Sequence, residues 1–159
     1  MIYRLATIDD AGRLAELCWE HQAEFDSLNP DDRDKFISIS TEHLKRRLGI
    51  DLYCWIADDN EIVAHMFIYI IQKMPMPHRI EASWGRVATV RTIPEYRNKG
   101  IGSTLMGYVK SWSKELNLQE LIVYPSEQSV SFYERAGFSN ENEVYELLPD
   151  ETICSCGYT

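Results

Sequence analysis

Residues 97–102 read RNKGIG and combine two basic side chains, Arg97 and Lys99, with two glycines at the start of a helical pattern. The first amides of a helix have no intrahelical partner, and the helix dipole adds positive charge there, so a helix N-terminus can bind phosphate oxygens. Glycine has no Cβ, which lets the backbone approach a bulky diphosphate closely. The segment therefore predicts a site for a phosphate-bearing ligand.

Two common nucleotide motifs do not fit this segment. The dinucleotide fingerprint GxGxxG would need a third glycine at Leu105, and the P-loop places lysine after its glycines, whereas Lys99 precedes them. A structural alternative is that Gly100 and Gly102 merely permit a tight strand-to-helix connection. The segment by itself leaves both the phosphate site and this alternative open.

The segment RNKGIG resembles the R/Q-x-x-G-x-G/A signature of the GCN5-related N-acetyltransferases, and IPEYR at 93–97 and SVSFYERAGF at 129–138 resemble the same family. The resemblance implies an α/β fold of the acyl-CoA N-acyltransferase type. That fold has a central, mostly antiparallel sheet, splayed between its fourth and fifth strands, with helices on both faces. The implied co-substrate is acetyl-CoA, whose diphosphate would bind at the start of the helix.

The resemblance also implies which residues bind this carrier and which act on it. The implied carrier-binding residues are Val90, Thr92, Arg97, Asn98, Lys99, Gly100, Ile101, Gly102, Ser103 and Ser126. Backbone groups of Val90 and Thr92 would pair with the pantetheine arm, and an amide near Thr92 would polarise the thioester carbonyl. Tyr133 matches the tyrosine that commonly protonates the departing thiolate, because a phenol with a pKa of about 10 is protonated at neutral pH. Alternatively, Tyr133 packs in the core.

The base that deprotonates an amine acceptor is not evident in the sequence. The catalytic glutamate of some relatives falls at Arg86, which removes the simplest candidate. The remaining candidates are Glu81, His65, Glu143 and Glu24, and none of them is preferred. Trp84 and Trp55 could line an acceptor pocket or pack in the core.

The spacing of apolar residues predicts the elements that must position these side chains. The segment 97–102, which we call the phosphate turn, is expected to follow a strand at 83–92 and to open a helix that runs from Gly100 to about Leu116. A parallel strand is expected at 121–124. The segment 62–71 is apolar on both faces, which predicts a central strand. The other expected elements are a strand at 2–6, a helix capped within 7–10, a loop at 27–35, a short helix from Ser40 or Thr41 to Gly49, a strand at 53–57, a helix at 129–136 closed by Gly137, and strand material at Phe138 and 144–148.

The composition predicts a single domain over residues 1–159, with a short polar tail from about residue 150. Hydrophobic residues make up 45% of the chain, and 25 acidic against 16 basic residues give a net charge of −9. This acidity argues against nucleic acid as a partner and mildly favours a cationic acceptor.

The cysteines and the apolar runs bear on cellular location. The chain has four cysteines, Cys18, Cys54, Cys154 and Cys156, and none has metal-ligand spacing, so we expect free thiols and no metal site. A metal or redox role for the last two is the alternative. No signal peptide is recognisable, and the longest apolar run is too short to span a bilayer. We therefore expect a cytoplasmic protein with no membrane partner; the family often forms homodimers.

The residues and the family resemblance are compatible with three functions. The first is an enzyme that transfers an acetyl group from acetyl-CoA to a primary amine. The second is a regulatory module that binds acetyl-CoA with little or no turnover, which the missing glutamate would allow. The third is an enzyme that uses a longer acyl-CoA or an alcohol acceptor.

Overall fold

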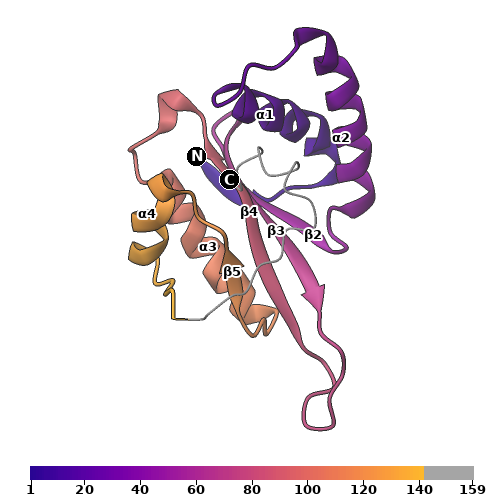
Figure 1. Cartoon of the computed structure of the whole chain (residues 1–159), viewed down its shortest axis with the longest axis vertical. Coiled ribbons are helices and arrows are strands. Elements are labelled where there is room, and N and C mark those ends of the chain that lie inside the picture. The colour runs from indigo at the N-terminus through magenta and orange to yellow at the C-terminus, as the bar shows by residue number, and fades with distance from the viewer. Residues whose placement is uncertain (142–159) are drawn as a thin grey trace, which may run out of the picture.

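The computed structural model describes residues 1–141, which form one five-stranded sheet in the order β1-β2-β3-β4-β5 with helices on both faces (Figure 1). The strands are β1 (Ile2–Leu5), β2 (Leu52–Asp58), β3 (Ile62–Gln72), β4 (Ser83–Thr92) and β5 (Leu121–Val123). The helices are α1 (Ala11–Ala23), α2 (Arg33–Arg47), α3 (Ile101–Glu115) and α4 (Val130–Arg135). Neighbouring strands are antiparallel except β4 and β5, which are parallel as a crossover through α3 requires.

The sheet separates two hydrophobic cores. On one face α1 and α2 bury Leu14 and Leu44 against Phe67, and on the other face α3 buries Leu105 against Met66. The central strand β3 contributes to both cores because its first seven residues are buried whichever face they point to. The predicted α/β architecture and the central position of the segment 62–71 are confirmed. In residues 1–141, no helix is long and apolar enough to cross a membrane.

Strand β4 is irregular at one residue, Thr89. Its register against β3 pairs Ala88 with Phe67 and Val90 with Met66, so Thr89 is an extra, unpaired residue that forms a β-bulge. The φ angle of Thr89 is +42°, which costs a β-branched residue about 1–3 kcal/mol. Bulges of this kind are common beside active sites, where they redirect a strand.

The sheet opens on the β5 side of the same strand. β4 pairs with β5 at Gly85, Arg86 and Val87, and no described residue continues the ladder beyond Val87. The second half of β4 therefore presents a free edge towards the chain that follows β5. This is the splay between the fourth and fifth strands that the family resemblance implies.

Two expectations about local structure were wrong. Helix α2 begins at Arg33 and not near Ser40, and Pro30–Asp32 in the expected loop forms a single turn of 3-10 helix that continues into it. Leu44 is the one fully buried residue of α2. In the first half of the helix Ile37 is half-buried, whereas Phe36 and Ile39 are exposed, so no continuous apolar stripe marks where the helix begins. Phe138 lies outside any strand, and the strand expected at 144–148 lies outside the described residues.

Candidate active site

The N-terminus of α3 presents unpaired amides. Gly100, the N-cap residue, has a φ angle of +77°, and Asn98 has one of +59°; this left-handed geometry folds the turn back under the helix. The helical ladder begins with Thr104, whose amide donates to the Gly100 carbonyl at 3.0 Å. Within residues 1–141, the amides of Ile101, Gly102 and Ser103 donate to no backbone oxygen.

These amides open into a cavity of about 820 Å³ that lies along the free edge of β4, between it and the chain of α3 and α4. All the predicted site residues except Lys99 line it. The lining residues from the prediction are Val90, Thr92, Arg97, Asn98, Gly100, Ile101, Gly102, Ser103, Ser126 and Tyr133. We call this cavity the carrier groove. Segments that are far apart in the sequence thus line one cavity. If Gly100 and Gly102 served only to permit a tight strand-to-helix connection, no such cavity would be needed.

The charge of the carrier groove is opposite to that of the whole chain. Its lining contains three arginines, Arg91, Arg97 and Arg135, against one carboxylate, Glu24, whereas the chain carries −9. Glu20 pairs with Arg91 from outside the lining, so the arginines exceed the carboxylates that pair with them by one. Positive charge in a concave site attracts a polyanionic ligand. Lys99 is not among the lining residues, and its ammonium lies 5.0 Å from the centre of the Tyr96 ring, which does line the groove.

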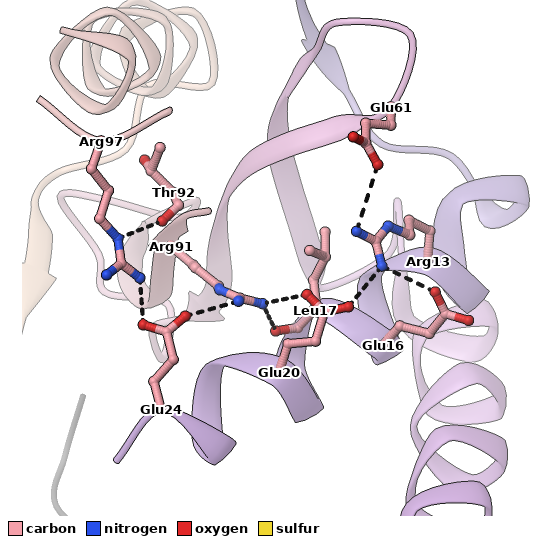
Figure 2. A network of polar contacts seen from close by, with 9 residues as sticks. All are labelled: Arg13, Glu16, Leu17, Glu20, Glu24, Glu61, Arg91, Thr92 and Arg97. Carbon is pink, nitrogen blue, oxygen red and sulfur yellow. Dashed lines mark hydrogen bonds and ion pairs between the residues drawn. The ribbon is translucent and has the colours of Figure 1, made fainter. Parts of the chain in front are cut away.

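A network of ion pairs connects α1 to the end of β4 and to Arg97 in the turn before α3 (Figure 2). The guanidinium of Arg91 is buried and donates to the Leu17 carbonyl at 2.6 Å, to Glu20 at 3.1 Å and to Glu24 at 2.8 Å. Arg97 binds the other oxygen of Glu24 and also donates to the Thr92 carbonyl at 2.9 Å. Glu24 therefore bridges both arginines and fixes α1 against the end of β4.

This bridge makes Glu24 a poor base. Burial by itself would raise the pKa of Glu24, but hydrogen bonds from Arg97 and Arg91 outweigh it and hold the pKa below its ordinary value. The carboxylate is therefore ionised and fully engaged at neutral pH.

We expect the substitution Glu24→Gln to lower the free energy of unfolding by about 1–3 kcal/mol at pH 7, because the buried Arg91 loses a charged partner. The measurement is urea denaturation. Since the pKa is lowered, the contribution is present above pH 4.5 and is lost as the pH falls through the lower, folded-state pKa. The control is Glu16→Gln, which breaks a half-exposed pair with Arg13 and should change the free energy by less than about 1 kcal/mol. Equal effects of the two substitutions at pH 7 would contradict the bridging role.

Tyr133 combines the two environments that the sequence left as alternatives. Its side chain is buried and its ring makes edge contacts with Phe132 and Phe138, at 5.1 and 5.5 Å between ring centres, yet it also lines the carrier groove. Burial raises the pKa of Tyr133 to about 12, so the phenol is protonated at any physiological pH. It can donate a hydrogen bond to an anion in the groove.

The other residues considered in the sequence lie elsewhere. His65 is fully buried between β2 and β4, where burial lowers its pKa to about 3. Glu81 is exposed in the β3–β4 loop, which projects away from the helices (Figure 1). Trp55 stacks on Tyr108 of α3 at 5.3 Å. Trp84 does not line the carrier groove. Glu143 lies outside the described residues.

Several lining residues had no role in the sequence analysis. They include His21, Phe25, Thr89, Arg91, Gln128 and Arg135. His21 and Phe25 come from the end of α1 and the residues after it, and a single helical sequence does not indicate which strand its last turn meets. Arg135 lies inside the motif SFYERAGF, so its place in that motif could have identified it as a residue of the site. Among residues 1–141, no cluster of three or more histidine, cysteine or acidic side chains could hold a metal ion.

Comparison with known proteins agrees with this geometry. Residues 14–138 match the model of the acetyltransferase (GNAT) family. The chain is similar to a predicted acetyltransferase of Clostridium acetobutylicum crystallised with acetyl-CoA, with 23% identity, a TM-score of 0.70 and coverage of 92% and 95% of the two chains. It is also similar to the ribosomal-protein-alanine N-acetyltransferase of Brucella melitensis biovar Abortus, with 17% identity, a TM-score of 0.70 and coverage of 93% and 99%.

A curated relative is the amino-acid acetyltransferase of Buchnera aphidicola subsp. Schizaphis graminum, which is 26% identical over 147 residues. That alignment covers 92% of this chain but 28% of the relative, so the chain spans little more than a quarter of the relative's length.

The free strand edge, the open helix start and the matched family model define one class of protein: the chain belongs to the acetyltransferase (GNAT) family. The family resemblance, the fold and acetyl-CoA as the family's acetyl donor are thereby confirmed.

Proposed function

We propose that the chain transfers an acetyl group from acetyl-CoA to a primary amine by direct attack in a ternary complex. The observation that carries this proposal is the continuity of one groove, in which the open amides of α3, the free edge of β4 and Tyr133 lie together. In the reaction the amine nitrogen bonds to the thioester carbon, the carbon–sulfur bond breaks, and the coenzyme leaves as a thiolate that ends as a thiol.

The chain's residues would divide the binding of the carrier between two regions. The amides of Ile101, Gly102 and Ser103 would hold the diphosphate, with the α3 dipole adding to their attraction. The edge of β4 from Val90 to Thr92 would hydrogen-bond the pantetheine arm, as a further strand would. The net positive lining of the groove supports this arrangement.

Tyr133 would stabilise the departing thiolate by donating a hydrogen bond. Its pKa of about 12 lies above that of a thiol, roughly 8.5, so complete proton transfer from the phenol to the thiolate is unfavourable. We therefore assign the phenol to charge stabilisation, and the proton that the amine releases would finally neutralise the sulfur. This modifies the acid role that the family resemblance implies.

His21 is the base that the groove offers. The one carboxylate among the described lining residues, Glu24, is held by two arginines, whereas the imidazole of His21 lines the groove with its Nδ1 buried and unpaired. Burial and then Arg91 lower the pKa of His21 below 6.5, against an opposing effect of Glu24, so the ring is neutral at pH 7. A neutral imidazole can accept the proton, although its low pKa makes it a weak base.

We expect His21→Asn to lower kcat about tenfold at pH 8, less than the usual range for general bases because the imidazole is weakly basic. Only the neutral imidazole of His21 can accept a proton. The ratio of wild-type to variant kcat should therefore fall towards one as the pH drops below 6.5 and the imidazole becomes protonated. Taking this ratio with a single acceptor cancels the titration of the acceptor itself. A ratio that stays constant with pH would assign His21 a structural role.

The alternative proposal is a module that binds acetyl-CoA without turnover. The two are separated by mixing the protein with acetyl-CoA and a broad panel of primary amines and measuring free thiol. We expect thiol release that depends on the amine. Tight binding of acetyl-CoA with no thiol release from any amine would favour the binding module, and release with alcohols or longer acyl chains would redefine the substrates.

A further inference from the structure

A second cavity lies on the α2 side of β4. It has a volume of about 570 Å³ and is lined by Arg47, Asp51, Tyr69, Ile70, Ile71, Arg86, Ala88 and Thr89. Ala88 and Thr89 line the carrier groove as well, so the two cavities meet at the β-bulge. The bulge is therefore the point at which a ligand in the second cavity would come nearest to a thioester held along β4.

Arg86 is the residue of this cavity whose hydrogen bonding is incomplete. Its Nε is buried without a hydrogen-bond partner, and the guanidinium forms no ion pair with any residue of 1–141. Its guanidinium carbon lies 5.2 Å from the centre of the Tyr124 ring, which orients the group but supplies no negative charge. A buried donor without an acceptor is destabilising, and a ligand oxygen that accepts from it removes this penalty.

The remaining charges of the cavity cancel. Arg47 binds Asp51 through two hydrogen bonds of 2.7 Å, so these two side chains neutralise one another. The cavity therefore carries one uncompensated positive charge, that of Arg86, in a chain of net charge −9. One positive charge matches a carboxylate, whereas a phosphate monoester carries about −1.5 to −2 at pH 7.

We propose that this second cavity binds the acceptor, and that the acceptor is an amino acid whose carboxylate binds Arg86 while its amine lies at the Thr89 bulge. The inference rests on the proposed acetyl transfer. Arg86 and Thr89 are three residues apart on one strand, roughly 10 Å between Cα atoms, and the arginine side chain reaches over part of that distance. The separation that remains suits a small molecule carrying both groups.

The arginine that replaces the expected glutamate thus acquires a role. A guanidinium inside the acceptor cavity would repel a simple cationic amine, and it attracts an amine that brings its own carboxylate. The same side chain that cannot act as a base selects the substrate.

Binding is the direct test, because it does not require turnover. Isothermal titration calorimetry is carried out on protein saturated with coenzyme A, using matched ligand pairs: arginine with agmatine, phenylalanine with phenethylamine, and lysine with cadaverine. At least one amino acid should bind ten or more times tighter than its decarboxylated partner. Arg86→Gln should remove that preference and leave coenzyme A affinity unchanged. Arg46→Gln, which alters an exposed arginine of α2 outside the cavity, should keep the preference.

Three results would overturn the inference: no binding of any amino acid, equal affinity within every pair, or a preference that survives in Arg86→Gln. Phosphoethanolamine serves as a further arm, and its tighter binding would identify a phosphate site instead. The thiol-release assay distinguishes this failure from failure of the proposed function. If decarboxylated amines are turned over as efficiently as the matching amino acids, the amino-acid acceptor is rejected and the proposed acetyl transfer is retained. If amino acids bind selectively but release no thiol, the acceptor site is retained and the proposed acetyl transfer is rejected.

Discussion

The substitution Gly102→Val is expected to weaken acetyl-CoA binding by at least about 100-fold, which is roughly 2.7 kcal/mol. A Cβ at Gly102 would point towards the Phe132 ring, at 3.6 Å, and towards the Thr92 hydroxyl, at 4.0 Å. These are ordinary contacts, so the fold tolerates the Cβ, but the two γ-methyl groups of valine would occupy the groove beside the open amides. Several charge-assisted hydrogen bonds to the diphosphate would then be lost, each worth about 1.5–3 kcal/mol. Isothermal titration calorimetry with acetyl-CoA measures the change.

Alanine at the same position is the matched control. It adds the Cβ alone, fits the G/A alternative of the motif, and should bind acetyl-CoA within about tenfold of wild type because no γ-methyl enters the groove. Gly100 is a less suitable position, because its φ angle of +77° would strain any side chain and confuse folding with binding. Valine at position 102 with wild-type affinity and an unchanged melting temperature would show that the diphosphate binds elsewhere.

The second large effect is expected from Tyr133→Phe, which should lower kcat about 100-fold with little change in acetyl-CoA affinity. The phenol donates to charge that develops on the sulfur as the thioester breaks, so its removal affects the transition state more than the ground state. Burial is the one influence on the Tyr133 hydroxyl from residues 1–141, with no hydrogen bond among them, and the ring contacts with Phe132 and Phe138 are retained in phenylalanine. The fold should therefore persist. Steady-state thiol release and calorimetry together separate kcat from affinity.

Tyr108→Phe provides the comparison for this substitution. Tyr108 lies on α3, stacks between Tyr3 and Trp55, and does not line the carrier groove. Its loss of a hydroxyl should leave kcat within about twofold. A full rate for Tyr133→Phe would remove the phenol from the mechanism and return Tyr133 to a packing role.

The sequence was most informative where local chemistry determines local structure. The bounds of β4 were predicted to the residue, and the start of α3 to within one residue, because apolar alternation, a proline turn and a glycine pair follow one another there. All of the predicted site residues but Lys99 lie on one groove, because the family motif already encodes their relative positions. Lys99 does not line the groove, and its ammonium lies over the ring of Tyr96.

The features that the sequence did not predict depend mostly on contacts between distant segments. The bulge at Thr89 follows from the register of β4 against β3, and the segment VATV around it reads as an ordinary strand. The bridge from Glu24 to Arg91 and Arg97 joins residues 67 and 73 positions apart, a separation at which no motif operates. The start of α2 was missed because its exposed first half has no apolar stripe. Arg86 was visible as a departure from the family, but its cavity requires Arg47 and Tyr69, which the sheet and α2 bring beside it.

The central claim is that open amides at the start of α3 bind the diphosphate of acetyl-CoA, and backbone amide NMR tests it most directly. The protein is titrated with acetyl-CoA and, separately, with S-acetylpantetheine, which lacks the diphosphate. We predict saturable shifts of the Ile101, Gly102 and Ser103 amides with acetyl-CoA, and shifts confined to β4 and its neighbours with S-acetylpantetheine. Unchanged amides at residues 101–103 in the presence of bound acetyl-CoA, or shifts clustered away from α3, would contradict the account.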